Sequence, residues 1–348
     1  MRAITVRPGT AGSVQLEEVD DPDPADGPVL VETLAVGVCG TDREIIAAEH
    51  GQAPPGRDRL VLGHESLGRV LEAPADSGLT VGDLVVGIVR RPDPVPCPNC
   101  AVDEWDMCRN GRYTEHGIKA VDGFARERFR IDSHHLVKID PSLGELGVLV
   151  EPASIVAKAW EHIEHIGQRA HWQPSRVLVT GAGPIGLLAA LLARQRGLDV
   201  TVLDRVTDGA KPDAVAALGA HYHVGDVATA AHGADVVVEA TGVASLVFEV
   251  MQHNAHNAIV CLTGVTSPGR GLDVAGGVIA RGLVLENDVV FGSVNANRRH
   301  YRAAADALAD TDPSWLQRLV TREVPLDDWQ EAYTPSQEDI KTVLRFPS

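Results

Sequence analysis

Residues 176–186 are Arg-Val-Leu-Val-Thr-Gly-Ala-Gly-Pro-Ile-Gly, and this stretch decides the fold of the middle of the chain. The apolar, β-branched run predicts a strand that ends in a G-x-G-x-x-G turn, and residues 185–196 predict an apolar helix directly after it. Gly181 allows the tight turn, Gly183 lets the backbone approach a pyrophosphate, and Gly186 allows close helix–strand packing. The motif predicts a dinucleotide site, and its cofactor-binding residues are Gly181, Gly183, Pro184, Ile185 and Gly186.

The choice between two nicotinamide dinucleotides depends on the next strand, 199–204, which ends in Asp204. A carboxylate at that place binds the adenosine ribose hydroxyls and repels a 2′-phosphate, which favours NAD. Arg205 follows it and could bind the phosphate if Asp204 turns away, so NADP stays open. Thr241 and Thr263, at the ends of two later predicted strands, are expected near the cofactor.

The pattern of elements divides the chain into two predicted domains of an α/β protein. Strands alternate with helices over residues 156–301, which predicts a doubly wound parallel sheet of the Rossmann type. Residues 1–155 contain short strands separated by Gly, Pro and Asp turns, which indicates a mostly β catalytic domain. The tail, 302–348, mixes a helix with strands and is expected to return to that first domain.

Metal-ligating residue types gather in the predicted catalytic domain. Cys39 lies in a Cys-Gly-Thr-Asp segment, and His64 lies in a Gly-His-Glu segment. With Glu151, this thiolate and imidazole can hold a catalytic zinc and leave one position open for substrate. Glu65 is a possible alternate ligand, or a neighbouring base that tunes the metal and relays protons. The Thr41 hydroxyl is placed to contact the substrate oxygen and pass its proton outward.

A second candidate metal site is formed by Cys97, Cys100 and Cys108, spaced C-x2-C-x7-C. A structural zinc requires four ligands in a closed tetrahedron, and three thiolates on one loop supply most of them. The alternative is a loop with three cysteines and no metal. The candidates for the fourth ligand are the carboxylates Asp93, Asp103 and Asp106.

Composition excludes several functions. The formal net charge of −17 argues against nucleic acid and acidic membranes as partners, because both require basic patches. The longest apolar run is far short of the roughly 20 residues of a membrane helix. The N-terminus has no apolar signal region. We therefore expect a cytoplasmic protein, and five cysteines in a cytoplasmic chain indicate metal binding or chemistry rather than disulfides.

The metal segments, the cysteine loop and the glycine turn together resemble the zinc-dependent medium-chain dehydrogenase superfamily. The glucose 1-dehydrogenase branch is the most similar, through residues 38–45, 63–68, 111–118 and 292–297. The resemblance implies a GroES-like catalytic domain and oxidation of the anomeric hydroxyl of an aldose to the aldonolactone, with hydride transfer to NAD(P). It also implies catalytic zinc ligands at Cys39, His64 and Glu151, sugar binding by Glu115, Glu151 and Asn295, and a cofactor contact by Asn295.

The resemblance leaves specific alternatives open. Pro94 stands where the superfamily has the first cysteine of the loop, which makes Asp93 the candidate substitute. The substrate could be a polyol or a simple secondary alcohol instead of a sugar. A non-catalytic sensor of the nicotinamide ratio is a further alternative. An edge strand near 289–291 predicts a homodimer or homotetramer.

Overall fold

The computed structural model describes residues 1–266 and 271–347 of the chain. The chain folds as two compact units, one of residues 1–154 and the residues from Asn295 onward, the other of Ile155–Val294. The sequence-based limits of the catalytic domain, 1–155 with 302–348, and of the dinucleotide-binding domain, 156–301, remain a prediction. Within the described residues no helix is long and apolar enough to span a membrane.

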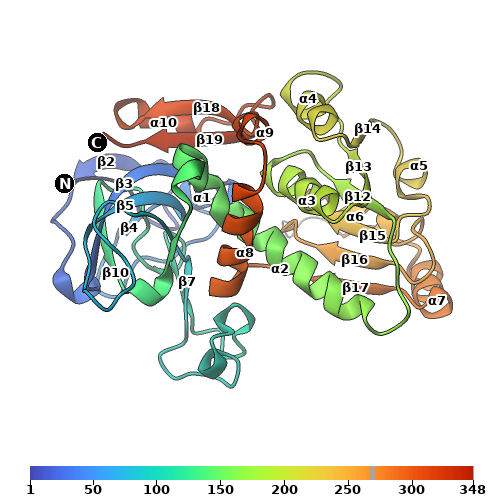
Figure 1. Cartoon of the computed structure of the whole chain (residues 1–348), viewed down its shortest axis with the longest axis horizontal. Coiled ribbons are helices and arrows are strands. Elements are labelled where there is room, and N and C mark those ends of the chain that lie inside the picture. The colour runs from blue at the N-terminus through green and yellow to red at the C-terminus, as the bar shows by residue number, and fades with distance from the viewer. Residues whose placement is uncertain (267–270, 348) are drawn as a thin grey trace. The chain divides into compact units, whose positions relative to one another are not determined.

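The first unit is built on a seven-stranded sheet ordered β11-β6-β5-β3-β19-β18, with β10 also paired to β3. Its strand β3 is mostly apolar, alternates buried and half-buried residues from Val29 to Leu34, and contributes Val29, Val31, Val36 and Val38 to the core. The last strand, β19, pairs antiparallel with β3 and lies beside β18 (Figure 1). The strands are β3 (Val29–Val38), β5 (Glu65–Glu72), β6 (Leu84–Gly87), β10 (Arg128–Ile131), β11 (Leu136–Lys138), β18 (Val320–Pro325) and β19 (Lys341–Arg345).

Smaller elements complete this unit, and its mostly β character confirms the prediction. Two three-stranded sheets consist of β1 (Arg2–Val6), β2 (Gln15–Glu18) and β4 (Leu60–Val61), and of β7 (Arg90–Arg91), β8 (Thr114–His116) and β9 (Ala120–Val121). The α-helices are α1 (Gly40–Ile46), α8 (Arg298–Ala309), α9 (Pro313–Gln317) and α10 (Trp329–Tyr333). The 3-10 helices are η1 (Pro24–Asp26), η2 (Cys100–Val102), η3 (Trp105–Met107), η4 (Ser133–His135), η5 (Pro141–Leu149) and η6 (Leu326–Asp328).

The second unit contains one six-stranded parallel sheet in the order β14-β13-β12-β15-β16-β17. The strand order reverses direction between β12 and β15, which is the doubly wound Rossmann arrangement predicted from the sequence. The strands are β12 (Arg176–Thr180), β13 (Asp199–Leu203), β14 (His221–His223), β15 (Val236–Glu239), β16 (Ile259–Leu262) and β17 (Val289–Gly292).

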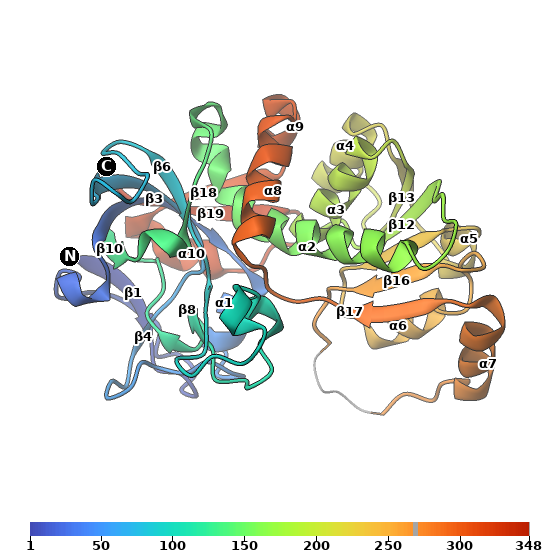
Figure 2. The same ribbon diagram turned by 60° about the horizontal axis from the view of Figure 1, so that its bottom comes forward.

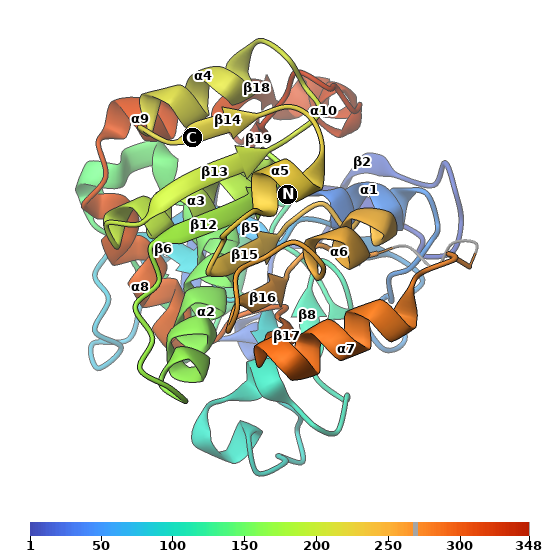
Figure 3. The ribbon, with the colours of Figure 1, turned by 90° about the vertical axis from the view of Figure 1, so that its right-hand side faces the viewer.

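Helices cover both faces of this parallel sheet. Figures 2 and 3 show α2 and α3 over one face and α6 and α7 over the other. Helix α3 is buried along most of its length, because it is apolar on all sides and lies between the sheet and α2. The helices are α2 (Val150–Gly167), α3 (Pro184–Gln195), α4 (Ala210–Ala217), α5 (Val227–Ala231), α6 (Ala244–Val250) and α7 (Gly276–Glu286).

Candidate active site

A cluster of possible metal ligands forms where β3 ends and β5 begins. Cys39 is the N-cap of α1, and His64 and Glu65 lie at the start of β5. One ligand atom from each of the three side chains lies within 4.8 Å of the others. Gly37 is needed here, since a Cβ at that position would collide with the Glu65 carboxylate. The backbone therefore brings together a thiol, an imidazole and a carboxyl from two distant segments.

Asp42 orients the histidine of this cluster, a role that the sequence analysis did not assign. Its Oδ1 faces His64 Nδ1 at 3.4 Å, and its Oδ2 accepts a hydrogen bond of 2.9 Å from Cys39 N. Burial lowers the pKa of His64, but the Asp42 carboxylate outweighs it and holds that pKa well above the usual range. With Nδ1 directed at Asp42, the ring presents Nε2 to a metal, as in carboxylate–histidine–zinc triads.

Lys341 forms a buried ion pair with Glu65 and was not singled out by the sequence. Its Nζ lies 2.7 Å from Oε1 and 2.6 Å from Oε2, and both side chains are almost fully buried. Burial lowers the pKa of Lys341, but Glu65 outweighs this and raises it. The pair holds the Glu65 carboxylate in the wall of the cluster.

Glu151 and Thr41 lie outside that three-residue group. Glu151 is in the first turn of α2 and is buried, and burial raises the pKa of its carboxyl to about 7. The charges of His64 and Glu65 also act on the pKa of this carboxyl, His64 lowering it and Glu65 raising it. Thr41 is half-buried in the first turn of α1, two residues after Cys39.

Two of the three residues implied as sugar-binding, Glu115 and Asn295, contact each other. Asn295 Nδ2 donates a hydrogen bond of 2.8 Å to Glu115 Oε1, although the residues are 180 positions apart in the chain. Asn295 has a φ of 61°, in the left-handed region that asparagine tolerates, and its Oδ1 accepts from Ala296 N at 2.8 Å. Arg90 also contacts Glu115, with Nε and Nη2 at 3.1 and 2.9 Å from Oε1. This arginine is a third site residue that the sequence did not indicate.

The glycine turn of the second unit has the expected geometry. Gly181 has a φ of 89°, and a Cβ on Gly186 would collide with its carbonyl oxygen. Pro184 and Ile185 form the first turn of α3, and Pro184 occupies a position where its missing N–H costs nothing. A Cβ on Gly183 would meet no atom within 4 Å, which is consistent with open space above the turn.

Asp204 is already engaged by its own backbone surroundings. Its Oδ2 accepts a hydrogen bond from Ala182 N at 2.7 Å, and its Oδ1 accepts from Val206 N at 3.0 Å. Lys211 Nζ lies 3.8 Å from Oδ2. Burial raises the pKa of Asp204, but these backbone hydrogen bonds and Lys211 outweigh it and lower the pKa. The carboxylate therefore stays charged, and a lysine partly neutralises it.

The two threonines at strand ends are held by the buried Glu239. Thr241 N donates to Glu239 Oε1 at 2.7 Å, and the Thr241 hydroxyl bonds to the same oxygen. Thr263 Oγ1 donates to Glu239 O at 2.8 Å. Both threonines follow parallel strands at the carboxyl edge of the sheet, where ligands of this fold bind.

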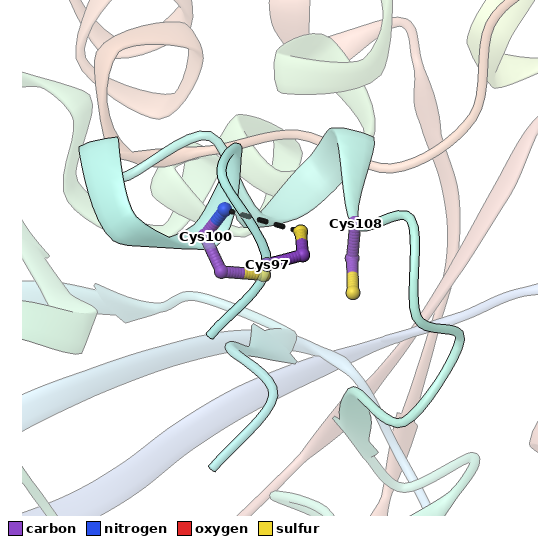
Figure 4. Close-up of side chains that lie close together, drawn as sticks. All are labelled: Cys97, Cys100 and Cys108. Atoms are coloured by element: carbon purple, nitrogen blue, oxygen red, sulfur yellow. Dashed lines mark hydrogen bonds between the residues drawn. The ribbon is translucent and has the colours of Figure 1, made fainter. Parts of the chain in front are cut away.

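The three cysteines of the loop lie together (Figure 4). Their sulfur atoms are within 4.8 Å of one another, and the Cys97 thiol accepts from Cys100 N at 3.5 Å and Arg109 N at 3.4 Å. These hydrogen bonds lower the pKa of Cys97 to about 6. Asp93 binds Val95 N at 2.8 Å and Arg112 Nε at 3.2 Å through its carboxylate. The structure thus gathers the three sulfurs, while the carboxylate of the candidate fourth ligand has other partners.

Two family models cover most of the chain. Residues 25–141 match the alcohol dehydrogenase GroES-like domain, and residues 144–346 match the glucose dehydrogenase C-terminus. The first match assigns the class, a medium-chain dehydrogenase with a GroES-like domain. The chain belongs to the glucose dehydrogenase family of that class, as the resemblance in the sequence predicted.

Relatives of known name are similar over the full length. Glucose 1-dehydrogenase 1 of Caldivirga maquilingensis is 40% identical, with 99% of each chain covered. Glucose 1-dehydrogenase of Methanocella arvoryzae is 38% identical, again with 99% of each covered. The solved structure of Haloferax mediterranei glucose dehydrogenase, in complex with NADP, Zn and gluconolactone, is 36% identical over all of both chains with a TM-score of 0.92.

Proposed function

We propose that this protein is a zinc-dependent glucose 1-dehydrogenase that oxidises the anomeric hydroxyl of an aldose, D-glucose or a similar sugar, to the aldonolactone. Hydride passes from the anomeric carbon to NADP or NAD, and the hydroxyl proton leaves to solvent. The observation that carries the proposal is the presence, in one unit, of the Cys39–His64–Glu65 group and the hydrogen-bonded pair Glu115–Asn295. The full-length similarity to named glucose 1-dehydrogenases supports it.

The donor set fits zinc. Cys39 and His64 provide a soft thiolate and an imidazole whose other nitrogen faces Asp42 at 3.4 Å. The third ligand is a carboxylate, Glu151 by the family resemblance or Glu65 by its place in the group. When bound, zinc supplies Lewis acidity that lowers the pKa of a coordinated hydroxyl.

The residues around the metal site orient the substrate and move its proton. Thr41 lies two residues from Cys39 on the first turn of α1, and we propose that its hydroxyl accepts the substrate proton and passes it outward. Glu115 and Asn295 bind sugar hydroxyls, because a carboxylate accepts and an amide both donates and accepts. Replacement of Cys39 by alanine should abolish turnover and lower bound zinc while the fold remains.

Cofactor choice is part of the proposal. Both carboxylate oxygens of Asp204 accept hydrogen bonds from backbone N–H groups, and Lys211 Nζ lies 3.8 Å from Oδ2. Arg205, the next residue in the chain, is exposed and is a second candidate cation for this place. A 2′-phosphate would therefore meet cations as well as the carboxylate, which favours use of NADP beside NAD. Calorimetry with 2′,5′-ADP and ADP tests this. In Lys211→Met, affinity for 2′,5′-ADP should fall about tenfold or more and affinity for ADP should change little; Arg281→Met on exposed α7 is the matched control.

We also propose a homodimer or homotetramer formed through the second unit. Strand β17 ends its sheet in the described part of the chain, and α7 exposes Val278, Val284 and Leu285. An open strand edge beside exposed apolar side chains is suited to pairing with a second copy. Light scattering should give at least twice the monomer mass, and Val284→Asp should lower the measured mass.

The cytoplasmic location remains a prediction. All five cysteines are free thiols, which is consistent with a reducing compartment.

A second zinc on Cys97, Cys100 and Cys108 also belongs to the proposal. Three sulfurs within 4.8 Å, with backbone N–H groups directed at Cys97, form a pre-arranged thiolate site. Either Asp93 leaves Arg112 to become the fourth ligand or a water molecule fills that place.

The deciding experiment is a set of initial rates with the zinc-loaded enzyme. The substrates are D-glucose, D-galactose, D-xylose, sorbitol and 2-propanol, each with NAD and with NADP. Higher initial rates on the aldoses than on sorbitol and 2-propanol support the proposal. Activity on sorbitol or 2-propanol alone would keep the dehydrogenase chemistry and reject the sugar substrate.

A further inference from the structure

Arg90 and Glu115 face each other across the short β7–β8 pair. They are direct partners in the antiparallel register, and the arginine is only 5% exposed. Glu115 is 12% exposed at its side chain. Buried charges of this kind need partners, and each of these two residues supplies the other's counter-charge.

The hydrogen bonds to Glu115 are strongly uneven. Oε1 accepts from Arg90 Nε at 3.1 Å, from Arg90 Nη2 at 2.9 Å and from Asn295 Nδ2 at 2.8 Å. Among residues 1–266 and 271–347, no group donates a hydrogen bond to Glu115 Oε2. A carboxylate oxygen has about two lone-pair sites, so three donors fill Oε1 completely. The free acceptor capacity of this side chain is therefore on Oε2.

The guanidinium that causes this asymmetry is fixed in place. Arg90 Nη1 donates to Asp106 O at 3.0 Å, and the guanidinium carbon lies 3.7 Å from the centre of the Tyr113 ring. A cation stacked on an aromatic face and bonded at three nitrogens has little rotational freedom. Arg90 thus fixes the plane of the Glu115 carboxylate.

We propose that Arg90 is a positioning residue for sugar recognition: it saturates Glu115 Oε1 and so directs Oε2 to accept one sugar hydroxyl. The inference rests on the proposed function, because Glu115 must contact the sugar. A carboxylate held in one orientation binds a hydroxyl more strongly than a mobile one. It also discriminates against a sugar that lacks the hydroxyl, since Oε2 then has no hydroxyl to accept from.

The test uses the full-length zinc-loaded enzyme with glucose and its 2-, 3-, 4- and 6-deoxy analogues. For each analogue, the loss of kcat/KM relative to glucose is measured in the unmodified enzyme and in Glu115→Ala. The hydroxyl bound by Glu115 is the one whose removal causes the largest loss in the unmodified enzyme and little loss in Glu115→Ala. We expect that loss to be about 10- to 100-fold in the unmodified enzyme. In Arg90→Met it should shrink to about threefold or less, while KM for glucose rises and KM for NADP stays within about twofold. Arg90→Lys keeps a charge without the fork and should fall between the two.

Arg69→Met is the matched control. Arg69 and Glu32 are also cross-strand partners in this unit, with Nη1 3.4 Å from Oε2, but Arg69 is exposed and Glu32 is only half-buried. In this control variant, the loss of kcat/KM for each deoxy analogue should equal that of the unmodified enzyme. If Arg90→Met lowers activity on all the sugars equally, with the selective penalty intact, then Arg90 has a purely structural role and the inference is wrong. If the unmodified enzyme turns over no aldose, the proposed function fails before the Arg90 variants are compared.

Discussion

Replacing Lys341 with methionine removes the counter-charge of a buried carboxylate. Lys341 and Glu65 side chains are 3% and 2% exposed, and Nζ lies within 2.7 Å of both carboxylate oxygens. Breaking a buried ion pair by removing one partner costs about 3–5 kcal/mol, because the other charge stays without compensation. For a unit of roughly 200 residues this corresponds to a fall of about 6–20 °C in the Tm.

Calorimetry of the metal-free protein measures this effect without interference from zinc. The double variant Lys341→Met/Glu65→Gln removes the stranded charge as well, so it should recover most of the lost Tm. Added zinc should stabilise Lys341→Met more than the unmodified protein, since the released Glu65 carboxylate can join Cys39 and His64 as a ligand.

Two results would refute this reasoning. A loss of less than about 1 kcal/mol in Lys341→Met would mean that Glu65 does not need the lysine. A double variant as unstable as the single variant would mean that packing of the lysine stem, and not charge, is responsible.

Three further predictions concern other parts of the first unit. Burial raises the pKa of Glu127, but hydrogen bonds from Arg2 outweigh it and lower that pKa below its ordinary value. The ionised Glu127 therefore stabilises the folded state fully above about pH 4.3, and this contribution is lost as the pH falls through the folded-state pKa. Glu127→Gln should lower the free energy of unfolding by about 1 kcal/mol at pH 7, measured by urea unfolding. This difference should disappear once the pH falls below the folded-state pKa of Glu127, and a difference that persists in strong acid contradicts the prediction. Cys100→Ser should lower the zinc content of the purified protein by one equivalent, measured by atomic emission, and an unchanged content would exclude a metal at the cysteine loop. Gly37→Ala should displace the Glu65 carboxylate, weaken zinc binding and lower the Tm, and a variant with native zinc affinity would contradict the steric argument.

The second unit was largely predictable because its strands are continuous apolar runs. The edge strand predicted near 289–291 lies within β17, and the one at 199–204 differs from β13 by a single residue. Strand β14, with the sequence His-Tyr-His, was missed. It lies at the edge of the sheet and has no apolar periodicity, so only its pairing with β13 defines it.

The site was predictable where chemistry concentrates in short motifs. The residue types and neighbouring residues of the glycine turn, Cys39 and His64 are enough to identify them as candidate site residues. Lys341 and Arg90 do not, because each acts through a carboxylate that is far away in the sequence. Lys341 is 276 positions from Glu65, and a single lysine in a strand carries no local signal. Pairing across the sheet creates these contacts, and one sequence does not reveal which residues become partners.

The pairing of β19 with β3 has a consequence for how the protein is made. Strand β3 leaves the ribosome early, but its partner β19 is synthesised about 300 residues later. Thr342 of β19 lies opposite Val38 of β3. At roughly 5–20 residues per second, the nascent chain carries this unpaired edge for about 15–60 s. During that time the whole second unit emerges and can fold by itself, while the first unit lacks both a strand and the lysine that compensates Glu65. We therefore expect that co-translational chaperones attend the early part of the chain, and that premature termination leaves a folded nucleotide-binding half attached to an aggregation-prone β half.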